Sequence, residues 1–216
     1  PGAVAPRTYA VEMVVPTLVA AGMEMVVANL ALALAARGHQ VGVTCLEEGG
    51  ALAERLTDAG VAVSVEPTPG TLANFRAPAL ARHFARRRPD VVHSHSGVWG
   101  KAAVAARAAG VPGVVHTVHG LHEQEPWYGP ALKRWAGRHT DATVAVSAPL
   151  HDYLVRVTRL PAGRVHTVIN GVDVRRFAPG PRTGALAARL GLPNDRRFVG
   201  TVARLAPVKN QALLVE

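Results

Sequence analysis

Histidines gather in two short stretches, HSHSGVWGK beginning at His93 and HTVHGLH beginning at His116. His93 and His95 are two residues apart, so in a strand both side chains point to the same face. A catalytic zinc site would complete such a pair as H-x-H-x-D-H, but Gly97 and Val98 stand at the Asp and His positions of that pattern. We therefore expect no metal site, and the histidines become candidates for substrate contacts or for hydrogen bonds with neighbouring backbone.

A glycine stands between a strand pattern and a helix pattern in LVAAGMEMVV, residues 18–27. Residues 10–17 are mostly apolar or β-branched, as in a buried parallel strand, whereas apolar residues from Met23 onward recur with helical spacing. The first turn of a helix offers unpaired N–H groups and the positive end of a dipole. Gly22 at that point predicts an anion cradle, with a plain turn as the alternative.

Two cations near the end of the sequence have a spacing that suits a phosphate. Arg204 and Lys209 are five residues apart across a turn in RLAPVKN. Fixed cations stabilise the negative charge that develops on a diphosphate when it leaves, and the alternative is a pair of solvated surface charges. Gly100 and Lys101 do not form a phosphate loop, because Ala102 follows and no glycine lies five residues before Gly100.

The 216 residues carry a net charge of +9, unevenly distributed along the chain. Residues 1–70 contain three Arg against seven acids, so the basic surface belongs to residues 71–216. Such a surface suits nucleic acid, an anionic membrane or a phosphate-bearing substrate. Nucleic acid is the weakest of the three, because no zinc-finger spacing, RNA-binding signature or basic heptad array occurs.

Several features predict a soluble cytoplasmic protein. Charged residues such as Arg37 and Arg55 keep every apolar run below the ~20 residues of a membrane span. The opening PGAVAPRTYA lacks the basic-then-apolar order of a secretory signal. The single Cys45 lies in the strand-like VGVTCL and is expected to be a buried thiol, which fits a reducing compartment.

Around these residues, β-rich runs alternate with helical patterns along the sequence. This alternation predicts an α/β fold with a Rossmann-like parallel sheet and helices on both faces. The expected strands are residues 10–15, 40–46, 61–65, 91–95, 113–118, 142–147 and 165–169. The clearest expected helices are residues 23–37, 51–59 and 101–109, and a glycine follows or closes each of them.

A change of composition divides the sequence after residue 178. Residues 174–197 are rich in Arg, Pro and Gly, as a linker is, and FVGTVARLAP and NQALLVE then read as a new strand and helix. One strand and half a helix cannot bury their apolar faces alone. We expect one domain over 1–178 and, over 179–216, a linker and the opening of a second, incomplete domain.

Two segments combine basic and aromatic residues, ALARHFARRR at 79–88 and WYGPALKRWAGR at 127–138. Basic amphipathic segments with aromatic residues bind anionic lipid interfaces. Ordinary half-buried helices show the same pattern, so both interpretations stay open.

Six motifs follow one another along the chain: AGME, PDVVHSH, VVHTVHG, VAVSAPLHDYLV, VINGVDVRRFAP and VGTVARLAPVKN. Their order and spacing resemble those of the retaining GT-B glycosyltransferases of family 4, over residues 10–216. The resemblance implies two facing Rossmann-like domains. The first, the GT-B N-terminal domain, would bind the acceptor, and the second would bind the nucleotide-sugar donor.

The resemblance assigns roles to individual residues. Gly22 would approach the donor diphosphate through its backbone amide, with Ala21 in place of the family's first glycine. His119 matches the active-site histidine that contacts the donor sugar, so it is the catalytic candidate. Arg204 and Lys209 match the second-domain pair that neutralises the diphosphate. The family's E-x7-E pair would lie beyond the last residue of this sequence.

The remaining polar or small residues at strand and helix ends would line the cleft or contact the acceptor. They are Glu24, His95, Ser96, Gly120, Ser147 and Asn170. The expected partners are a nucleotide-sugar and a glycan or lipid-linked acceptor, with no metal or other cofactor and no nucleic acid.

The implied activity is retaining transfer of a hexose from the nucleotide-sugar to the acceptor, and we expect these 216 residues alone not to catalyse it. The protein would be cytoplasmic or peripheral on the inner face of the membrane through 79–88 and 127–138. Two alternatives stay open: a sugar-nucleotide 2-epimerase of the same architecture, and a non-catalytic nucleotide-binding module.

Overall fold

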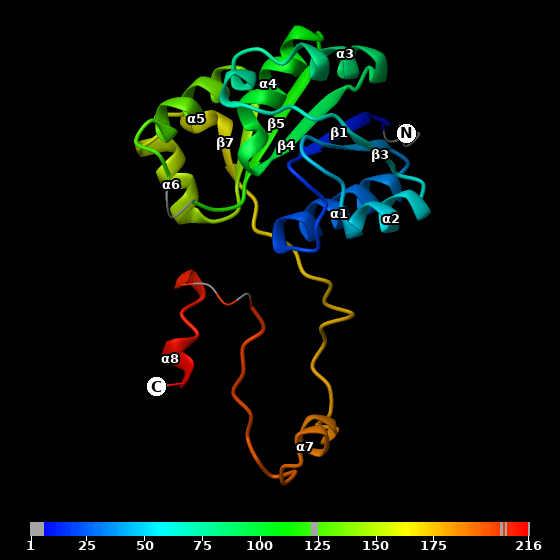
Figure 1. Cartoon of the computed structure of the whole chain (residues 1–216), viewed down its shortest axis with the longest axis vertical. Helices are drawn as coiled ribbons and strands as arrows, with labels where there is room; N and C mark the ends of the chain where they lie inside the picture. The colour runs from blue at the N-terminus through cyan, green and yellow to red at the C-terminus, as the bar shows by residue number, and fades with distance from the viewer. Residues whose placement is uncertain (1–6, 122–124, 204, 206, 216) are drawn as a thin grey trace, which may run out of the picture. The chain divides into compact units, whose positions relative to one another are not determined.

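A computed structural model describes residues 7–121, 125–203, 205 and 207–215. The chain divides into two compact units, Pro1–Gly171 and Val172–Glu216. The first unit holds a seven-stranded sheet and the helices that cover it (Figure 1).

The sheet is parallel throughout, and its strands follow the order β3-β2-β1-β4-β5-β6-β7. The strands are β1 Ala10–Val15, β2 Gln40–Cys45, β3 Ala62–Val65, β4 Val91–His95, β5 Gly113–Val118, β6 Ala142–Ala145 and β7 Val165–Thr167. The order reverses between β1 and β4, which is the topological switch point of a doubly wound fold. The predicted Rossmann-like sheet is confirmed, and the bounds of its seven expected strands lie within two residues of the observed ones.

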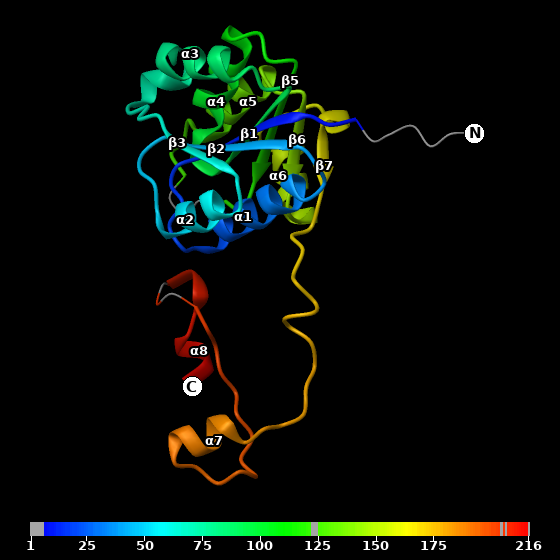
Figure 2. The same cartoon turned by 90° about the vertical axis from the view of Figure 1, so that its right-hand side faces the viewer.

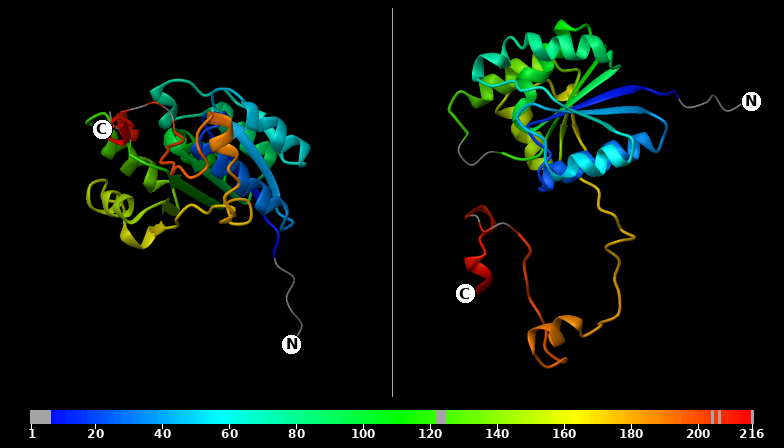
Figure 3. Two further views of the ribbon diagram at one scale, coloured as in Figure 1. Left: turned by 90° about the horizontal axis from the view of Figure 1, so that it is seen from below. Right: turned by 45° about the vertical axis from the view of Figure 1, so that its right-hand side comes forward.

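Helices cover both faces of the sheet, as predicted (Figures 1 and 3). One face carries α1 Gly22–Ala35 and α2 Ala51–Asp58, and the other carries α3 Pro78–Arg87, α4 Trp99–Ala108 and α5 Gly129–Arg138. A further helix, α6 Ala148–Arg156, packs against β6 and β7. Short 3-10 helices are η1 Thr71–Asn74, η2 Ser96–Val98 and η3 Ala162–Arg164.

Two hydrophobic clusters correspond to the two faces. Met13 and Val15 of β1 belong to the cluster formed with α1 and α2, whereas Val14 between them belongs to the cluster formed with α3 and α4. Both faces of β1 are therefore buried, which explains its nearly continuous apolar sequence. Each fully buried side chain of this size contributes roughly 1.5–3 kcal/mol through removal from water.

Helix α1 ends where the sequence predicts. Ala36 is its C-cap, and Gly38 then adopts a φ of +85°, a conformation that costs a residue with a Cβ atom more than it costs glycine. The chain reverses there and enters β2 at Gln40, whose N–H donates to Tyr9 O at 2.9 Å.

The second unit contains α7 Ala185–Leu190, η4 Pro207–Lys209 and α8 Ala212–Val215 (Figure 2). Residues 198–203, expected to form a strand, have no strand hydrogen bonds in this structure. A strand is stable only beside a neighbouring strand, and the described part of this unit offers none. Of the helices in the described ranges, none has both the length and the apolar character needed to cross a bilayer.

Candidate active site

The carboxyl edge of the sheet brings together most of the residues predicted for the site. Gly22 follows β1, His95 ends β4 and His119 follows β5, and these three strands are adjacent. Parallel strands end at the same edge, and β1 and β4 flank the switch point where ligands of such folds bind. The topology therefore places the glycine turn and the histidines along one edge.

Gly22 is exposed and is the first residue of α1. Its N-cap, Ala21, has no side-chain hydrogen bond to the helix, and the N–H groups of Gly22, Met23 and Glu24 donate to none of the described residues. A Cβ atom placed on Gly22 would meet nothing within 4 Å. The helix thus presents free donors and the positive end of its dipole to open space, the arrangement that binds anions.

Ala21 is compatible with this turn although it replaces a glycine of the family motif. Its φ is −131° and its ψ is 176°, an extended conformation that alanine adopts without strain. The turn is held by the Ala21 N–H, which donates to Val19 O at 2.9 Å.

Gly50 packs against the loop that leads to Gly22, a contact that the sequence did not predict. A Cβ atom on Gly50 would collide with the Leu18 carbonyl and the Val19 nitrogen. The Leu52 N–H, at the start of α2, also donates to Leu18 O at 3.0 Å. The signal was present as the Gly-Gly pair that follows β2, but nothing in the sequence identifies Leu18 as the partner.

His95 and His119 form a direct hydrogen bond, with His95 Nδ1 and His119 Nε2 3.0 Å apart. His95 is 1% exposed, whereas His119 is half-buried. The His93 ring lies beside His95 with ring centroids 4.2 Å apart, which confirms that these two side chains share a face. His93 Nε2 is paired with Thr117 Oγ1 at 2.8 Å.

His116 lies on the opposite face of the sheet, as its spacing from His119 predicts. Its Nδ1 is 2.8 Å from Ser94 Oγ, and its ring stacks on Trp99 with centroids 4.2 Å apart and planes 8° apart. Trp99 Nε1 donates in turn to Thr140 Oγ1 at 2.8 Å. His116 is therefore a packed part of the core beneath α4.

Burial keeps all four of these imidazoles neutral near pH 7. It lowers the pKa of His93 to about 4 and, with the neighbouring imidazoles, holds the pKa values of His95 and His116 well below the ordinary histidine value. Burial also lowers the pKa of His119. Neutral rings act as hydrogen-bond donors and acceptors, so the cluster cannot neutralise a diphosphate as a set of cations.

Other predicted site residues have more varied surroundings. Glu24 is buried in the first turn of α1, and Ser96 follows β4 with a φ of 59°, which is uncommon for a residue other than glycine. Ser147 accepts a hydrogen bond from the Leu150 N–H and so caps α6. Gly120 and Asn170 are exposed.

Lys209 lies in η4 of the second unit and is exposed. Arg204 lies outside the described residues. The role of this pair stays a prediction. Among the described residues, no group of three or more His, Cys, Asp or Glu side chains could hold a metal ion.

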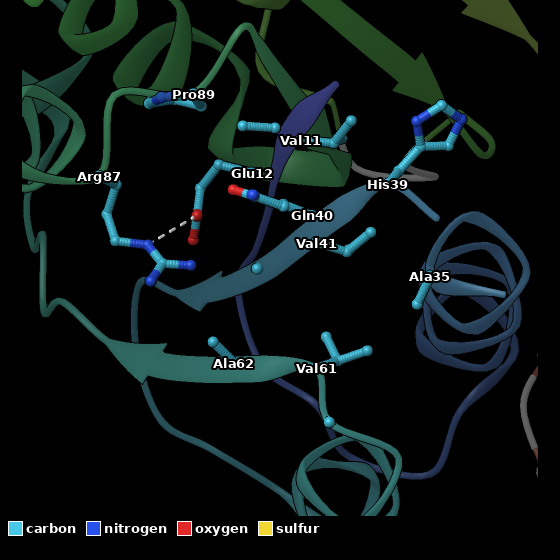
Figure 4. Close-up of a pocket in the computed structure, with 13 residues that line it drawn as sticks. Val11, Glu12, Ala35, His39, Gln40, Val41, Val61, Ala62, Arg87 and Pro89 are labelled. Carbon is cyan, nitrogen blue, oxygen red and sulfur yellow. Dashed lines mark hydrogen bonds and ion pairs between the residues drawn. The ribbon is translucent and has the colours of Figure 1, made fainter. Parts of the chain in front are cut away.

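A cavity of about 330 Å³ lies at the opposite, amino edge of β1, β2 and β3 (Figure 4). The Glu12 and Arg87 side chains point toward one another at its wall, with Arg87 Nε 3.2 Å from Glu12 Oε2. Thr44 Oγ1 donates to Glu12 Oε1 at 2.6 Å. This cavity is separated from the candidate site by the length of the strands, and its charged groups already pair with each other.

The two basic segments differ in which of their side chains are buried. In α3, Leu80 and Phe84 are fully buried in the core, and Arg86 and Arg87 pair with Glu66 and Glu12. This accounts for the pattern at 79–88 as that of a half-buried helix.

At 127–138, by contrast, Trp127 is 93% exposed and Tyr128 is also exposed. Trp135 packs against Phe75 with ring centroids 5.7 Å apart, and Trp135 Nε1 donates to Asn74 O at 3.3 Å. This second segment therefore leaves aromatic surface in contact with solvent.

Comparison with known proteins gives consistent matches. The chain is 31% identical over 226 residues to the D-inositol 3-phosphate glycosyltransferase of Kineococcus radiotolerans, covering 91% of this chain and 51% of that protein. It is 30% identical over 152 residues to the UDP-Gal:alpha-D-GlcNAc-diphosphoundecaprenol alpha-1,3-galactosyltransferase of Escherichia coli, covering 64% and 38% of the two chains. The chain thus spans about half the length of such relatives, or less.

The fold also matches a solved structure, Anabaena HepE in complex with UDP. The TM-score is 0.75 with 18% identity, over 95% of this chain and 56% of that chain, so this likeness concerns the fold alone. Residues 20–176 match the family pattern of Glycosyltransferase Family 4, which includes the glycine turn, the histidine cluster and β7. The chain belongs to Glycosyltransferase Family 4 and forms a GT-B-type Rossmann-like domain.

Proposed function

We propose that this chain forms the acceptor-side lobe of a retaining transferase, which moves a hexosyl group from a nucleotide-sugar to a glycan or a lipid-linked acceptor. One observation carries the proposal: the uncapped start of α1 at Gly22 and the half-buried His119 follow β1 and β5 at the same edge of the sheet, around the switch point. The names of the relatives, one of which uses UDP-Gal, favour a uridine diphosphate sugar as the donor.

The proposed mechanism divides the work between two lobes. The free N–H groups of Gly22, Met23 and Glu24 bind the diphosphate as it leaves, when its negative charge is greatest. His119 contacts the donor sugar, and Arg204 and Lys209 supply the cations on the other side. We assign no protein nucleophile to this step, and in this proposal retention proceeds through attack of the acceptor from the leaving-group side. No metal is required, because the helix and the cations neutralise the charge.

The other predicted residues have acceptor-side or structural roles in this proposal. Glu24, His95, Ser96, Gly120, Ser147 and Asn170 line the acceptor side of the cleft or support it. The enzyme would act in the cytoplasm, at the inner face of the membrane when its acceptor is lipid-linked. We also propose that these 216 residues do not transfer sugar alone, because relatives are about twice as long.

The test uses the enzyme completed by its donor-binding lobe, with UDP-galactose and UDP-glucose as donors and UDP release as the signal. His119→Ala should reduce turnover by about 100-fold, the lower end of the effect of losing one transition-state contact. His166→Ala, which changes an exposed histidine of β7, is the matched control and should leave turnover unchanged.

Full turnover by His119→Ala would remove His119 from the site. The same assay separates the epimerase alternative, because an epimerase converts the sugar nucleotide without any acceptor, whereas a transferase releases UDP in proportion to added acceptor. Membership of the family favours the transferase.

A further inference from the structure

His95 is completely enclosed at the end of β4, and one of its ring nitrogens has no partner. His95 Nδ1 is 3.0 Å from His119 Nε2. The other ring nitrogen, His95 Nε2, is buried and has no hydrogen-bond partner among the described residues. The neighbouring His93 ring does not supply one, and its Nε2 is paired with Thr117 Oγ1. These contacts constrain which nitrogen of each ring carries the proton.

Two neutral imidazoles that share one hydrogen bond need one donor and one acceptor. If His119 Nε2–H donates, the proton of His95 lies on the enclosed Nε2 and is an unpaired buried N–H group. If His95 Nδ1–H donates, its enclosed Nε2 carries only a lone pair. Unpaired buried donors are rarer in proteins than unpaired acceptors, so the second arrangement is favoured.

We propose that His95 is a positioning residue that donates its Nδ1–H to His119 Nε2 and so leaves His119 Nδ1–H as the donor available to a bound ligand. The ring nitrogen that binds the ligand is thereby a donor in the resting protein, and the group it would recognise is an acceptor oxygen. That this oxygen belongs to a sugar rests on the proposed function; the proton position itself does not.

Nitrogen-15 NMR of the histidine rings tests this directly in the ligand-free chain, because protonated and bare ring nitrogens have different chemical shifts. The expected result is a His119 ring protonated at Nδ1 and bare at Nε2, with the same tautomer for His95. A His119 ring protonated at Nε2 in the unmodified protein would overturn the proposal, whatever any variant does.

Three variants identify the cause. His95→Leu removes the donor, so a measurable population of His119 protonated at Nε2 should appear. His95→Asn places an amide nitrogen on Cγ, as Nδ1 is in histidine, and should restore the original tautomer. His93→Gln keeps a polar nitrogen near Thr117 Oγ1 and should leave His119 unchanged.

An unchanged His119 tautomer in His95→Leu, with the remaining amide spectrum of a folded protein, would show that His95 does not set it. The spectra are recorded without nucleotide or acceptor. A failed proton assignment therefore leaves the proposed transfer intact, and an inactive enzyme with the predicted tautomer leaves this inference intact.

Discussion

Gly50 packs directly against the backbone of Leu18, whose carbonyl occupies the space that a Cβ atom would need. The Leu52 N–H also donates to Leu18 O at 3.0 Å. The loop that leads from β1 to Gly22 therefore rests on the start of α2, so the position of the proposed anion cradle depends on a residue about thirty positions away in the sequence.

Gly50→Ala should lower the free energy of unfolding by about 1–3 kcal/mol, the usual cost of an atom added to a packed contact. Gly49→Ala is the matched control, because a Cβ atom there meets nothing within 4 Å. Urea denaturation of both variants measures the difference. Equal stabilities would show that the loop yields freely and that Gly50 does not hold it.

The sheet could be predicted from sequence because each buried strand is a short β-branched run between turn residues, as in β1 and β5. Helix ends could be predicted because glycine readily adopts the positive φ that ends a helix, as at Gly38. The contacts of Gly50 with Leu18 and of Glu12 with Arg87 could not be predicted. Each joins residues far apart in sequence, and periodicity carries no information about such pairs.

The candidate site was predictable in outline only. Strand ends share an edge in any parallel sheet, so His95 and His119 could be assigned to one region from their positions alone. Their hydrogen bond depends on the twist and register of β4 and β5, which the sequence pattern does not specify. Ser147 shows the reverse case, because a strand-end serine also serves as an ordinary helix cap.

The free energy of unfolding should depend on pH through the Glu12 carboxyl group. Burial raises the pKa of this carboxyl group, but nearby His83, the hydrogen bond from Thr44 and the Arg87 charge outweigh it and hold the pKa below 4.5. A lowered pKa in the folded state stabilises the protein above the unfolded value, and this contribution is lost as the pH falls through the folded pKa.

Glu12→Gln should therefore be less stable than the original chain by roughly 1–3 kcal/mol at neutral pH, and the difference should shrink below pH 4.5. Denaturation curves across this range measure it, with Glu48→Gln, an exposed acid, as the control. A difference that is independent of pH would exclude a stabilising carboxylate.

Cys45 should not react in the folded protein. Its side chain is fully buried, and burial raises the pKa of its thiol to about 11, so the thiolate that reacts with disulfide reagents is scarce. A chromogenic disulfide reagent at about pH 8 should label the thiol only after denaturant is added. Immediate stoichiometric labelling of the native chain would show that β2 opens readily.

The exposed aromatic surface around 127–138 should bind anionic lipid. The chain should sediment with phosphatidylglycerol vesicles and not with phosphatidylcholine vesicles, because Arg134 and Arg138 are exposed beside the aromatic residues. Trp127→Ala should weaken this binding about tenfold or more, since burial of a large apolar side chain contributes roughly 1.5–3 kcal/mol.

Phe177→Ala, which removes an exposed aromatic residue of the second unit, is the control for the lipid experiment. An equal loss of vesicle binding in both variants would indicate non-specific hydrophobic adsorption. No sedimentation with either kind of vesicle would exclude a lipid surface as a partner of this segment.

Titration of the chain with UDP tests whether the start of α1 binds a diphosphate. Amide NMR should show shifts at Gly22, Met23 and Glu24. Gly22→Val should abolish them by filling the open space, whereas Gly163→Val, at an equally open glycine on the opposite edge of the sheet, should retain them. Shifts that persist in Gly22→Val, or that avoid these three amides, would show that the start of α1 does not bind the diphosphate.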